Sequence, residues 1–311
     1  MLLLVSTVVM AICLVDLSTV QREHFMLRRG DLAGTIGSKA IVLHDSGVTA
    51  DIVLESTSDL RVQMRLFVPE ASPVDKLPLV VLLGGHRTGR FAVDLIDRPD
   101  EIAFAAIDYP YDGRQALSGA TQIAAAVPVI QDALLDTPAA LMLAMDWLSE
   151  QDWFDAQRAD LVGISLGVPF AAVAGALDTR FSRVWLIHGA SDNLAWINHA
   201  ARDRVEHAFL RRIAARTALF IAYGNSFDTT SWIREIAPRP LVIIVAEDDE
   251  RVPRNAIQGF IDSASNENVS LRWTRGQHIG HGRDRELEQL IEIVKLEVLS
   301  QSAGQATRVR P

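Results

Sequence analysis

The stretch RADLVGISLGVPFAAVAGAL, residues 158–177, decides the fold. Its first half is an apolar run with the length of a buried strand, and its second half is an alanine-rich run with helical character. Two glycines flank Ser165 where the two halves meet. A strand that leads directly into a helix is the repeating unit of parallel α/β sheets, so the stretch predicts that class of fold.

The rest of the chain repeats this alternation of apolar strands and helices. Near-continuous apolar runs are typical of parallel strands buried on both faces. Such runs lie at 77–85, 102–110, 158–165, 183–191 and 240–249, and a sixth strand is predicted at 269–276. Helical patterns lie at 91–101, 131–150, 166–177 and 286–299. Two further strands, 40–47 and 61–68, precede them and predict an antiparallel edge of the same sheet.

One α/β domain is therefore predicted over residues 40–300, after an apolar N-terminal segment and lead-in at 1–39 and before a polar tail at 301–311. The connection at about 189–239 is too long for an ordinary loop and contains helical segments. We expect it to form a small helical cap inserted before the fifth buried strand.

Composition excludes several classes of protein. The 311 residues are 49% hydrophobic, which is incompatible with intrinsic disorder. Cys13 is the only cysteine, so no intramolecular disulfide exists. The formal net charge of −9 argues against a nucleic-acid-binding surface, which is normally basic. Composition says nothing about oligomeric state.

The N-terminal run at residues 2–17 is apolar apart from hydroxyl residues and Asp16. A secretory signal requires basic residues before its apolar run, and none precedes this one. The run is also shorter than the roughly 20 residues of a transmembrane helix. Lipid attachment at Cys13 is disfavoured because Ile12 is large. The run is compatible with an export signal, a membrane anchor or a helix packed on the domain. The location of the protein is therefore open between extracytoplasmic, membrane-associated and cytoplasmic.

The motif GISLG at residues 163–167 carries the chemistry. Between a strand and a helix, G-x-S-x-G is typical of a strained turn that lifts the serine above the sheet. A serine nucleophile needs a base and an acid that orients the base. Strand ends later in the chain offer both, because AEDDERVP (246–253) carries four carboxylates and GQHIGHG (276–282) carries His278 and His281.

The chain resembles serine esterases of the α/β-hydrolase fold, near the dienelactone hydrolase, acetyl xylan esterase and prolyl-oligopeptidase-like groups, over nearly all of residues 50–300. The resemblance rests on PLVVLLGGHRTGR, AIDYPYDGR, DWFDAQRADLVGISLG, IAPRPLVIIVAEDDERVP and GQHIGHGRDRELEQLIEIV. It implies that Ser165 is the nucleophile. It also implies that the acid is the aspartate of a D-x-x-V-P segment, here Asp249, with Asp248 as the alternative and Asp192 as a lesser one.

The family's histidine follows the last strand in a glycine-containing turn, which favours His278 as the base and leaves His281 as the alternative. The resemblance also implies two backbone N–H donors for the oxyanion. One belongs to Leu166, and the other to Gly85 or His86, between which the sequence does not choose. The loop departs from the family pattern, since Leu83 stands where a histidine is common.

The predicted function is hydrolysis of a small-molecule carboxylic ester through an acyl-enzyme, with no cofactor and no metal. Because Cys13 is the only thiol, the mechanism must use serine. The alternatives are peptidase or acyltransferase chemistry on the same residues, and a catalytically silent binding protein. A metal site made of His278, His281 and Asp284 is a weaker interpretation, since zinc sites normally recruit cysteine or further histidines.

Overall fold

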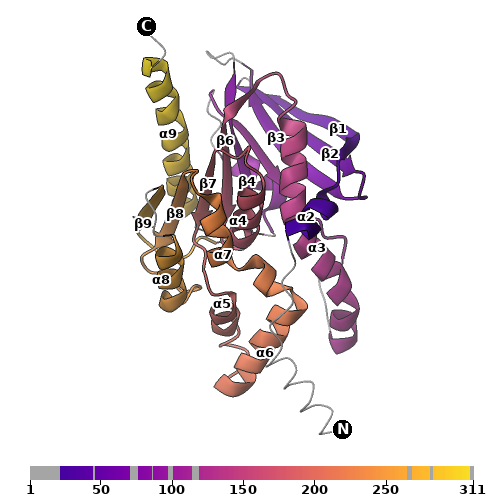
Figure 1. Cartoon of the computed structure of the whole chain (residues 1–311), viewed down its shortest axis with the longest axis vertical. Coiled ribbons are helices and arrows are strands. Elements are labelled where there is room, and N and C mark those ends of the chain that lie inside the picture. Colours follow the sequence, from indigo (N-terminus) through magenta and orange to yellow (C-terminus); the bar gives the residue numbers. More distant parts are fainter. Residues whose placement is uncertain are drawn as a thin grey trace.

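A nine-stranded sheet forms the centre of the computed structural model (Figure 1). The structure describes residues 22–44, 46–70, 76–85, 87–96, 101–113, 119–264, 268–280 and 283–308. The strands are β1 (Leu32–His44), β2 (Gly47–Ser56), β3 (Arg61–Pro69), β4 (Leu77–Leu83), β5 (Ala103–Ile107), β6 (Phe154–Ile164), β7 (Arg183–Ile187), β8 (Leu241–Ala246) and β9 (Val269–Thr274). Their spatial order is β1-β2-β3-β5-β4-β6-β7-β8-β9.

The sheet is parallel from β5 to β9 and antiparallel from β1 to β5. This confirms the predicted mostly parallel sheet with an antiparallel edge. The edge differs in detail, because it has three strands where the sequence predicted two, and β1 begins inside the predicted lead-in. Glycines interrupt β1, where the pairing register shifts, and polar Thr49 and Ser56 take buried positions in β2, so neither strand shows a clean apolar alternation.

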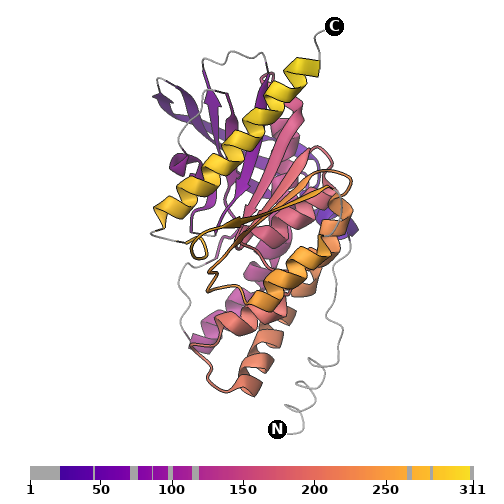
Figure 2. The ribbon, with the colours of Figure 1, turned by 90° about the vertical axis from the view of Figure 1, so that its left-hand side faces the viewer.

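Helices cover both faces of this sheet. Leu79, Val81 and Leu83 of β4 point into one core, and Val80 and Leu82 point into the other. The first core is shared with α2 (Arg22–Arg29), α3 (Gly119–Leu148), α4 (Gly167–Leu177), α7 (Thr229–Ile236) and α8 (Arg254–Ser263), and the second with η1 (Gly89–Leu95) and α9 (Asp284–Arg308). Figure 2 shows α9 crossing its face of the sheet, and the helix continues into the segment predicted as a tail.

One helix in the described part of the chain, Ala124–Leu148 of α3, is long and apolar enough to cross a membrane. Residues 139–145 of this helix are fully buried against the sheet, and half of the apolar window is buried. The C-terminal half of α3 is therefore a core helix, whereas its N-terminal half extends beyond the sheet (Figure 1).

Between β7 and β8, where the sequence predicted a cap, the chain forms α5 (Asn193–Ala200), α6 (Ala208–Ile221), η2 (Gly224–Phe227) and α7. The second half of this segment packs into the main core. The ring of Phe227 lies 4.9 Å from that of Phe170 in α4 and 5.9 Å from that of Phe25 in α2, and Trp232 lies 6.1 Å from Phe25. Only α5 and α6 extend away from the sheet.

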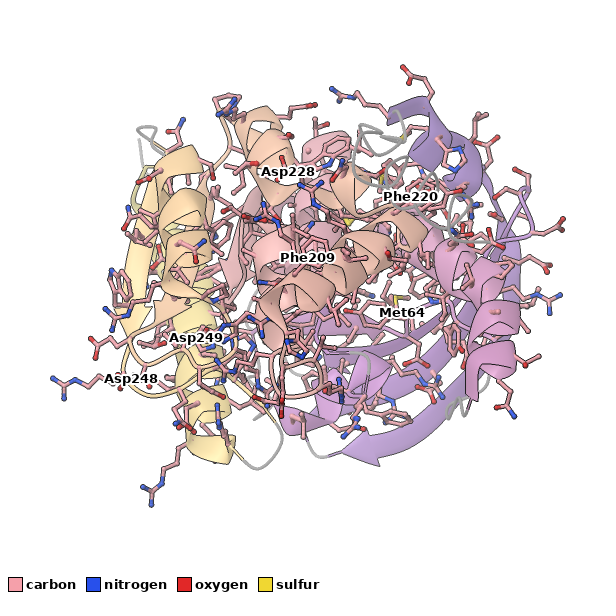
Figure 3. The ribbon with its side chains drawn as sticks, turned by 90° about the horizontal axis from the view of Figure 1, so that it is seen from below. Met64, Phe209, Phe220, Asp228, Asp248 and Asp249 are labelled. Carbon is pink, nitrogen blue, oxygen red and sulfur yellow. The ribbon has the colours of Figure 1, made fainter. Side chains whose placement is uncertain are left out.

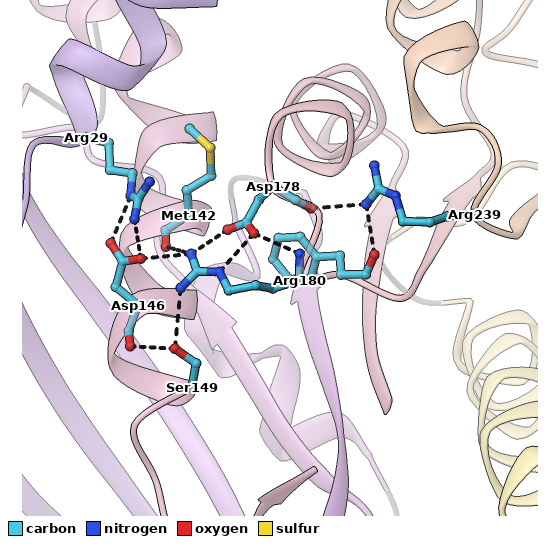
Figure 4. A network of polar contacts seen from close by, with 8 residues as sticks. Arg29, Met142, Asp146, Ser149, Asp178, Arg180 and Arg239 are labelled. Carbon is cyan, nitrogen blue, oxygen red and sulfur yellow. Dashed lines mark hydrogen bonds and ion pairs between the residues drawn. The ribbon is translucent and has the colours of Figure 1, made fainter. Parts of the chain in front are cut away.

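A polar network fixes the end of the sheet at which the parallel strands begin (Figure 4). Arg180 lies 2.8 Å from Asp146 of α3 and 2.6 Å from Asp178, and Arg29 of α2 also binds Asp146. Arg239, just before β8, donates to the carbonyl of Asp178. The network joins α2 and α3 to the segments that enter β7 and β8.

A buried ion pair joins β6 to β7. The carboxylate of Asp160 lies 2.6 Å from Arg183, and the two side chains are 4% and 3% exposed. We expect Asp160→Ala to lower the free energy of unfolding by about 3 kcal/mol or more, because it removes the closer carboxylate from the buried Arg183 and leaves the weaker pair with Glu297, 3.6 Å away.

Urea unfolding of the variant and of Glu55→Ala tests this expectation. Glu55 pairs with Arg61, whose side chain is 69% exposed, and loss of such a surface pair costs at most about 1 kcal/mol. Equal losses in the two variants would contradict the stabilising role of the buried pair.

Candidate active site

Ser165 lies in a tight turn between β6 and α4. Its φ of +53° is in the left-handed region, which is strained for a residue with a side chain. A Cβ at Gly163 would lie 2.5 Å from that of Ala171, and one at Gly167 would lie 2.0 Å from the carbonyl oxygen of Leu83. The two glycines therefore let strand, turn and helix approach closely enough to form this turn.

A chain of hydrogen bonds connects Ser165 to two loops that are distant in sequence. The Oγ of Ser165 lies 2.7 Å from Nε2 of His278, which follows β9. The Nδ1 of His278 lies 2.8 Å from Oδ2 of Asp249, which follows β8. The side chains of His278 and Asp249 are 0% and 2% exposed. The structure thus brings together the three residues that the sequence favoured.

Asp249 is held in its charged form. Its second oxygen accepts hydrogen bonds from the backbone N–H groups of Arg251 (2.9 Å) and Val252 (2.8 Å). Burial alone would raise the pKa of Asp249. The hydrogen bond and charge of His278, together with these two donors, outweigh burial and hold the pKa below its usual value.

The other predicted acids lie elsewhere. Asp248 is exposed, and its backbone N–H donates to the carbonyl of Gly276. Asp192 caps the N-terminus of α5 by accepting from the N–H of Ala195 (2.8 Å).

The predicted alternatives His86 and His281 lie outside the residues that the structure describes. Their suggested roles in oxyanion binding and as the base stay predictions. So does the metal site that would combine His281 with His278 and Asp284.

The backbone of His278 is clamped by two residues to which the sequence assigned no such role. Its N–H donates to Oε2 of Glu250 (3.0 Å). Arg283 pairs with the other oxygen of Glu250 (2.9 Å) and donates to the carbonyl of His278. Glu250 had appeared only as one of four carboxylates after β8, and nothing in the sequence pairs it with Arg283.

A second buried histidine lies beside His278. His188, at the end of β7, has a φ of +53°, and its ring centroid lies 5.5 Å from that of His278. Its Nδ1 accepts from the N–H of Ile279 (3.0 Å), so its proton resides on Nε2, which lies 3.1 Å from Oγ1 of Thr274. These contacts attach the end of β7 to the loop that carries His278.

His188, Asp249 and His278 offer possible ligand atoms that all lie within 4.8 Å of one another. Both ring nitrogens of each histidine already have hydrogen-bond partners, and so do both oxygens of Asp249. A metal ion would have to displace these bonds, so the three residues fit a hydrogen-bonded network better than a metal centre.

Leu166 and Gly85 are the candidate oxyanion donors within the described residues. Leu166 precedes the first residue of α4, where the helix dipole favours negative charge. Gly85 follows β4 in a turn closed by bonds from Thr88 and Gly89 to its carbonyl, and a side chain added to Gly85 would meet no atom within 4 Å.

Tyr109 supports the loop that carries Gly85, a role the sequence did not reveal. Its hydroxyl donates to the carbonyl of Gly84 (2.7 Å), and its ring packs 5.8 Å from that of Phe170. Burial raises the pKa of Tyr109, which keeps the hydroxyl protonated as a donor.

No protein-family model and no curated protein matches the sequence. Solved structures do match the fold. An acetyl xylan esterase from Paenibacillus sp. R4 superposes with a TM-score of 0.59 at 14% identity, over 90% of this chain and 96% of that one. An esterase from Pyrococcus furiosus gives 0.58 at 15% identity, over 86% and 98%. A glucuronoyl esterase from Solibacter usitatus gives 0.54 at 15% identity, over 89% and 92%. The chain has the α/β-hydrolase fold.

This result confirms the fold class that the sequence predicted. Within the α/β-hydrolase fold, Ser165 follows β6, Asp249 follows β8 and His278 follows β9. The carboxyl ends of parallel strands meet at one edge of a sheet, which is where ligands bind in such folds. At these low identities the likeness shows the fold alone.

The acid stability of the protein depends on His188. Burial and then the neighbouring His278 lower the pKa of His188 to about 4, against the opposing charges of Asp249 and Glu250. Between pH 6.5 and 4 the unfolded chain therefore takes up a proton that the folded chain does not, and acidification favours unfolding.

We expect His188→Asn to remove this dependence. Asparagine tolerates the left-handed φ and offers an oxygen where Nδ1 accepts from Ile279, but it does not titrate. Between pH 7 and pH 4.5 both proteins should lose unfolding free energy, and the loss should be about 2 kcal/mol smaller in the variant than in the wild type. Urea unfolding at both pH values measures it, and parallel losses would show that His188 is not buried in neutral form.

Proposed function

We propose that the chain is a serine hydrolase that cleaves carboxylic esters through an acyl-enzyme intermediate. The observation that carries the proposal is the unbroken hydrogen-bond chain from Ser165 through His278 to Asp249. In such an arrangement the histidine removes the serine proton, and the carboxylate fixes the tautomer of the histidine.

In the proposed reaction, Ser165 Oγ attacks the acyl carbon while its proton passes to Nε2 of His278. The backbone N–H groups of Leu166 and of Gly85 or His86 donate to the tetrahedral oxyanion. His278 then gives the proton to the alcohol oxygen as its bond to the acyl carbon breaks. Water loses a proton to His278 as it attacks the acyl-enzyme, and that proton returns to Ser165 when the acid leaves.

Asp249 stays ionised throughout this cycle. Its carboxylate accepts from Nδ1–H of His278, so Nε2 is free to receive the serine proton. The low pKa of Asp249 supports this role, because the carboxylate is charged at every pH at which the imidazole could act as a base.

A small-molecule ester is the substrate class we favour over a peptide or an acyl acceptor other than water. Solved structures with this fold include an acetyl xylan esterase and a glucuronoyl esterase. A catalytically silent binding protein would not need the serine, histidine and aspartate aligned at 2.7 and 2.8 Å.

A fluorophosphonate probe tests the proposal directly. We expect it to label Ser165, as peptide mass spectrometry would show, and to block hydrolysis of p-nitrophenyl acetate at the same rate. A folded sample with neither labelling nor hydrolysis would favour the silent binding protein. Labelling accompanied by efficient cleavage of peptide bonds would favour a peptidase.

A further inference from the structure

One end of the molecule exposes large apolar side chains. Phe209, Leu210 and Phe220 of α6 are 75%, 52% and 41% exposed, and Val129 of α3 is 38% exposed. We call the surface formed by α6 and the N-terminal half of α3 the α3–α6 end. Contiguous exposed apolar surface on a folded protein marks an interaction site more often than chance.

Helix α6 is apolar on two opposite faces. Ala215 and Leu219 are buried against the domain. Leu210, Ile213, Thr217 and Phe220 are spaced by three or four residues, so they form a stripe on the opposite side of the helix. The second stripe faces away from the core, and the fold itself gives no reason for it to be apolar.

The N-terminal half of α3 continues this surface. Residues 119–131 include no charged side chain. The side chain of Gln131 donates to the carbonyl of Ile221 (2.7 Å), so the two helices meet there. Figures 1 and 2 show both helices projecting from the same end of the sheet.

The segment 202–216 is net positive, with five arginines against Asp203 and Glu206, although the whole chain carries −9. Helix α6 contains three arginines, at 211, 212 and 216, and no acidic residue, and Arg204 lies shortly before it. Arg204 and Arg212 are exposed. Exposed aromatic and leucine side chains beside arginines are the composition of helices that lie in the interface of an anionic bilayer.

The position of this end in the molecule suits such a surface. Figure 3 shows α6, with Phe209 and Phe220, on the same side of the molecule as the loop that carries Asp248 and Asp249. The apolar run at residues 2–17 precedes α2, and Arg22 of α2 pairs with Glu235 of α7, so the chain enters the fold beside the inserted helices.

We propose that the α3–α6 end docks on an anionic lipid surface. Phe209, Leu210 and Phe220 enter the headgroup region, and Arg204 and Arg212 face the lipid phosphates. The docking does not depend on the proposed ester hydrolysis and is measured without it.

Co-sedimentation of the full chain with phosphatidylcholine vesicles, with and without phosphatidylglycerol, tests the surface. We expect Phe209→Ser/Phe220→Ser to weaken binding to anionic vesicles by about tenfold or more. Arg204→Gln/Arg212→Gln should weaken it by roughly tenfold on anionic vesicles only. Leu296→Ser, which removes a 60% exposed leucine of α9, is the matched control and should change nothing. Unchanged binding in the first two variants would overturn the proposal, even if residues 2–17 hold the chain on the vesicles.

A site-specific probe separates the lipid surface from other occupants. Thr217→Cys in a Cys13→Ser background carries one environment-sensitive fluorophore at a half-buried position of the stripe, between the exposed Leu210 and Phe220, and Leu296→Cys carries it on α9. Anionic vesicles should shift the emission to the blue at 217 and not at 296. A blue-shifted emission at 217 without vesicles would overturn the proposal. If that shift is independent of protein concentration, residues 2–17 are the occupant of the stripe. If the shift grows with protein concentration, the occupant is a second copy of the chain. No shift at 217 with vesicles would also overturn it.

Discussion

Replacement of Ser165 by alanine is expected to lower kcat/KM for p-nitrophenyl acetate by about 10⁵-fold or more. The variant keeps the proposed oxyanion donors, His278 and Asp249 but has no atom to form the acyl-enzyme. Because serine already has a Cβ at φ +53°, alanine adds no backbone strain, and the free energy of unfolding should be unchanged within about 0.5 kcal/mol.

The hydrogen-bond chain also predicts that losses will not add. His278→Ala should cost about as much as Ser165→Ala, and the double variant should lose no more than either one, because the two groups act as a unit. Ser182→Ala is the matched control, since its hydroxyl donates to the carbonyl of Ala159 at the opposite end of the strands. A Ser165→Ala enzyme with more than a hundredth of wild-type activity would contradict the assigned nucleophile.

The location of this site could be predicted because it depends on local sequence and on topology. The turn at Ser165 requires glycines at fixed positions next to it, so the motif is visible in five residues. Asp249 and His278 could be narrowed to two loops because each lies a few residues after a predicted strand. Parallel strands bring those loops to one edge, which makes a contact across 113 residues predictable from topology alone.

The supporting contacts could not be predicted, because they depend on pairings between loops that leave no local pattern. His188 meets the N–H of Ile279 across 91 residues, and Tyr109 meets the carbonyl of Gly84 across 25. Both use one polar atom of a residue type that is common at strand ends. The edge strand β1 was misplaced for a related reason, since glycine and polar residues hide the period on which strand prediction depends.

Replacement of Asp249 by asparagine is expected to lower kcat by about 10⁴-fold with little change in the loop. The amide oxygen can still accept from the N–H groups of Arg251 and Val252, so the backbone keeps its position. The amide nitrogen, however, donates toward Nδ1 of His278, which stabilises the tautomer with its proton on Nε2. That imidazole cannot accept the proton of Ser165.

Asp248→Asn is the control for this variant, because Asp248 is adjacent in sequence but exposed. We expect its kcat to stay within about twofold of the wild type. If Asp248→Asn were the more damaging change, the acid would be Asp248 and the observed pair with His278 would not be the reactive one.

The pH dependence of unfolding provides a second comparison of Asp249→Asn with the wild type. The pKa of Asp249 lies below its usual value, so its carboxylate stabilises the folded chain above about pH 4 and loses that effect as the pH falls through the folded pKa. The difference in unfolding free energy between wild type and Asp249→Asn should therefore shrink below pH 4. A carboxylate that only caps its loop would show the same trend, but Asp249→Asn would then retain near-normal kcat. Measuring kcat and unfolding on the same variant separates the role of Asp249 in orienting His278 from its role in holding the loop.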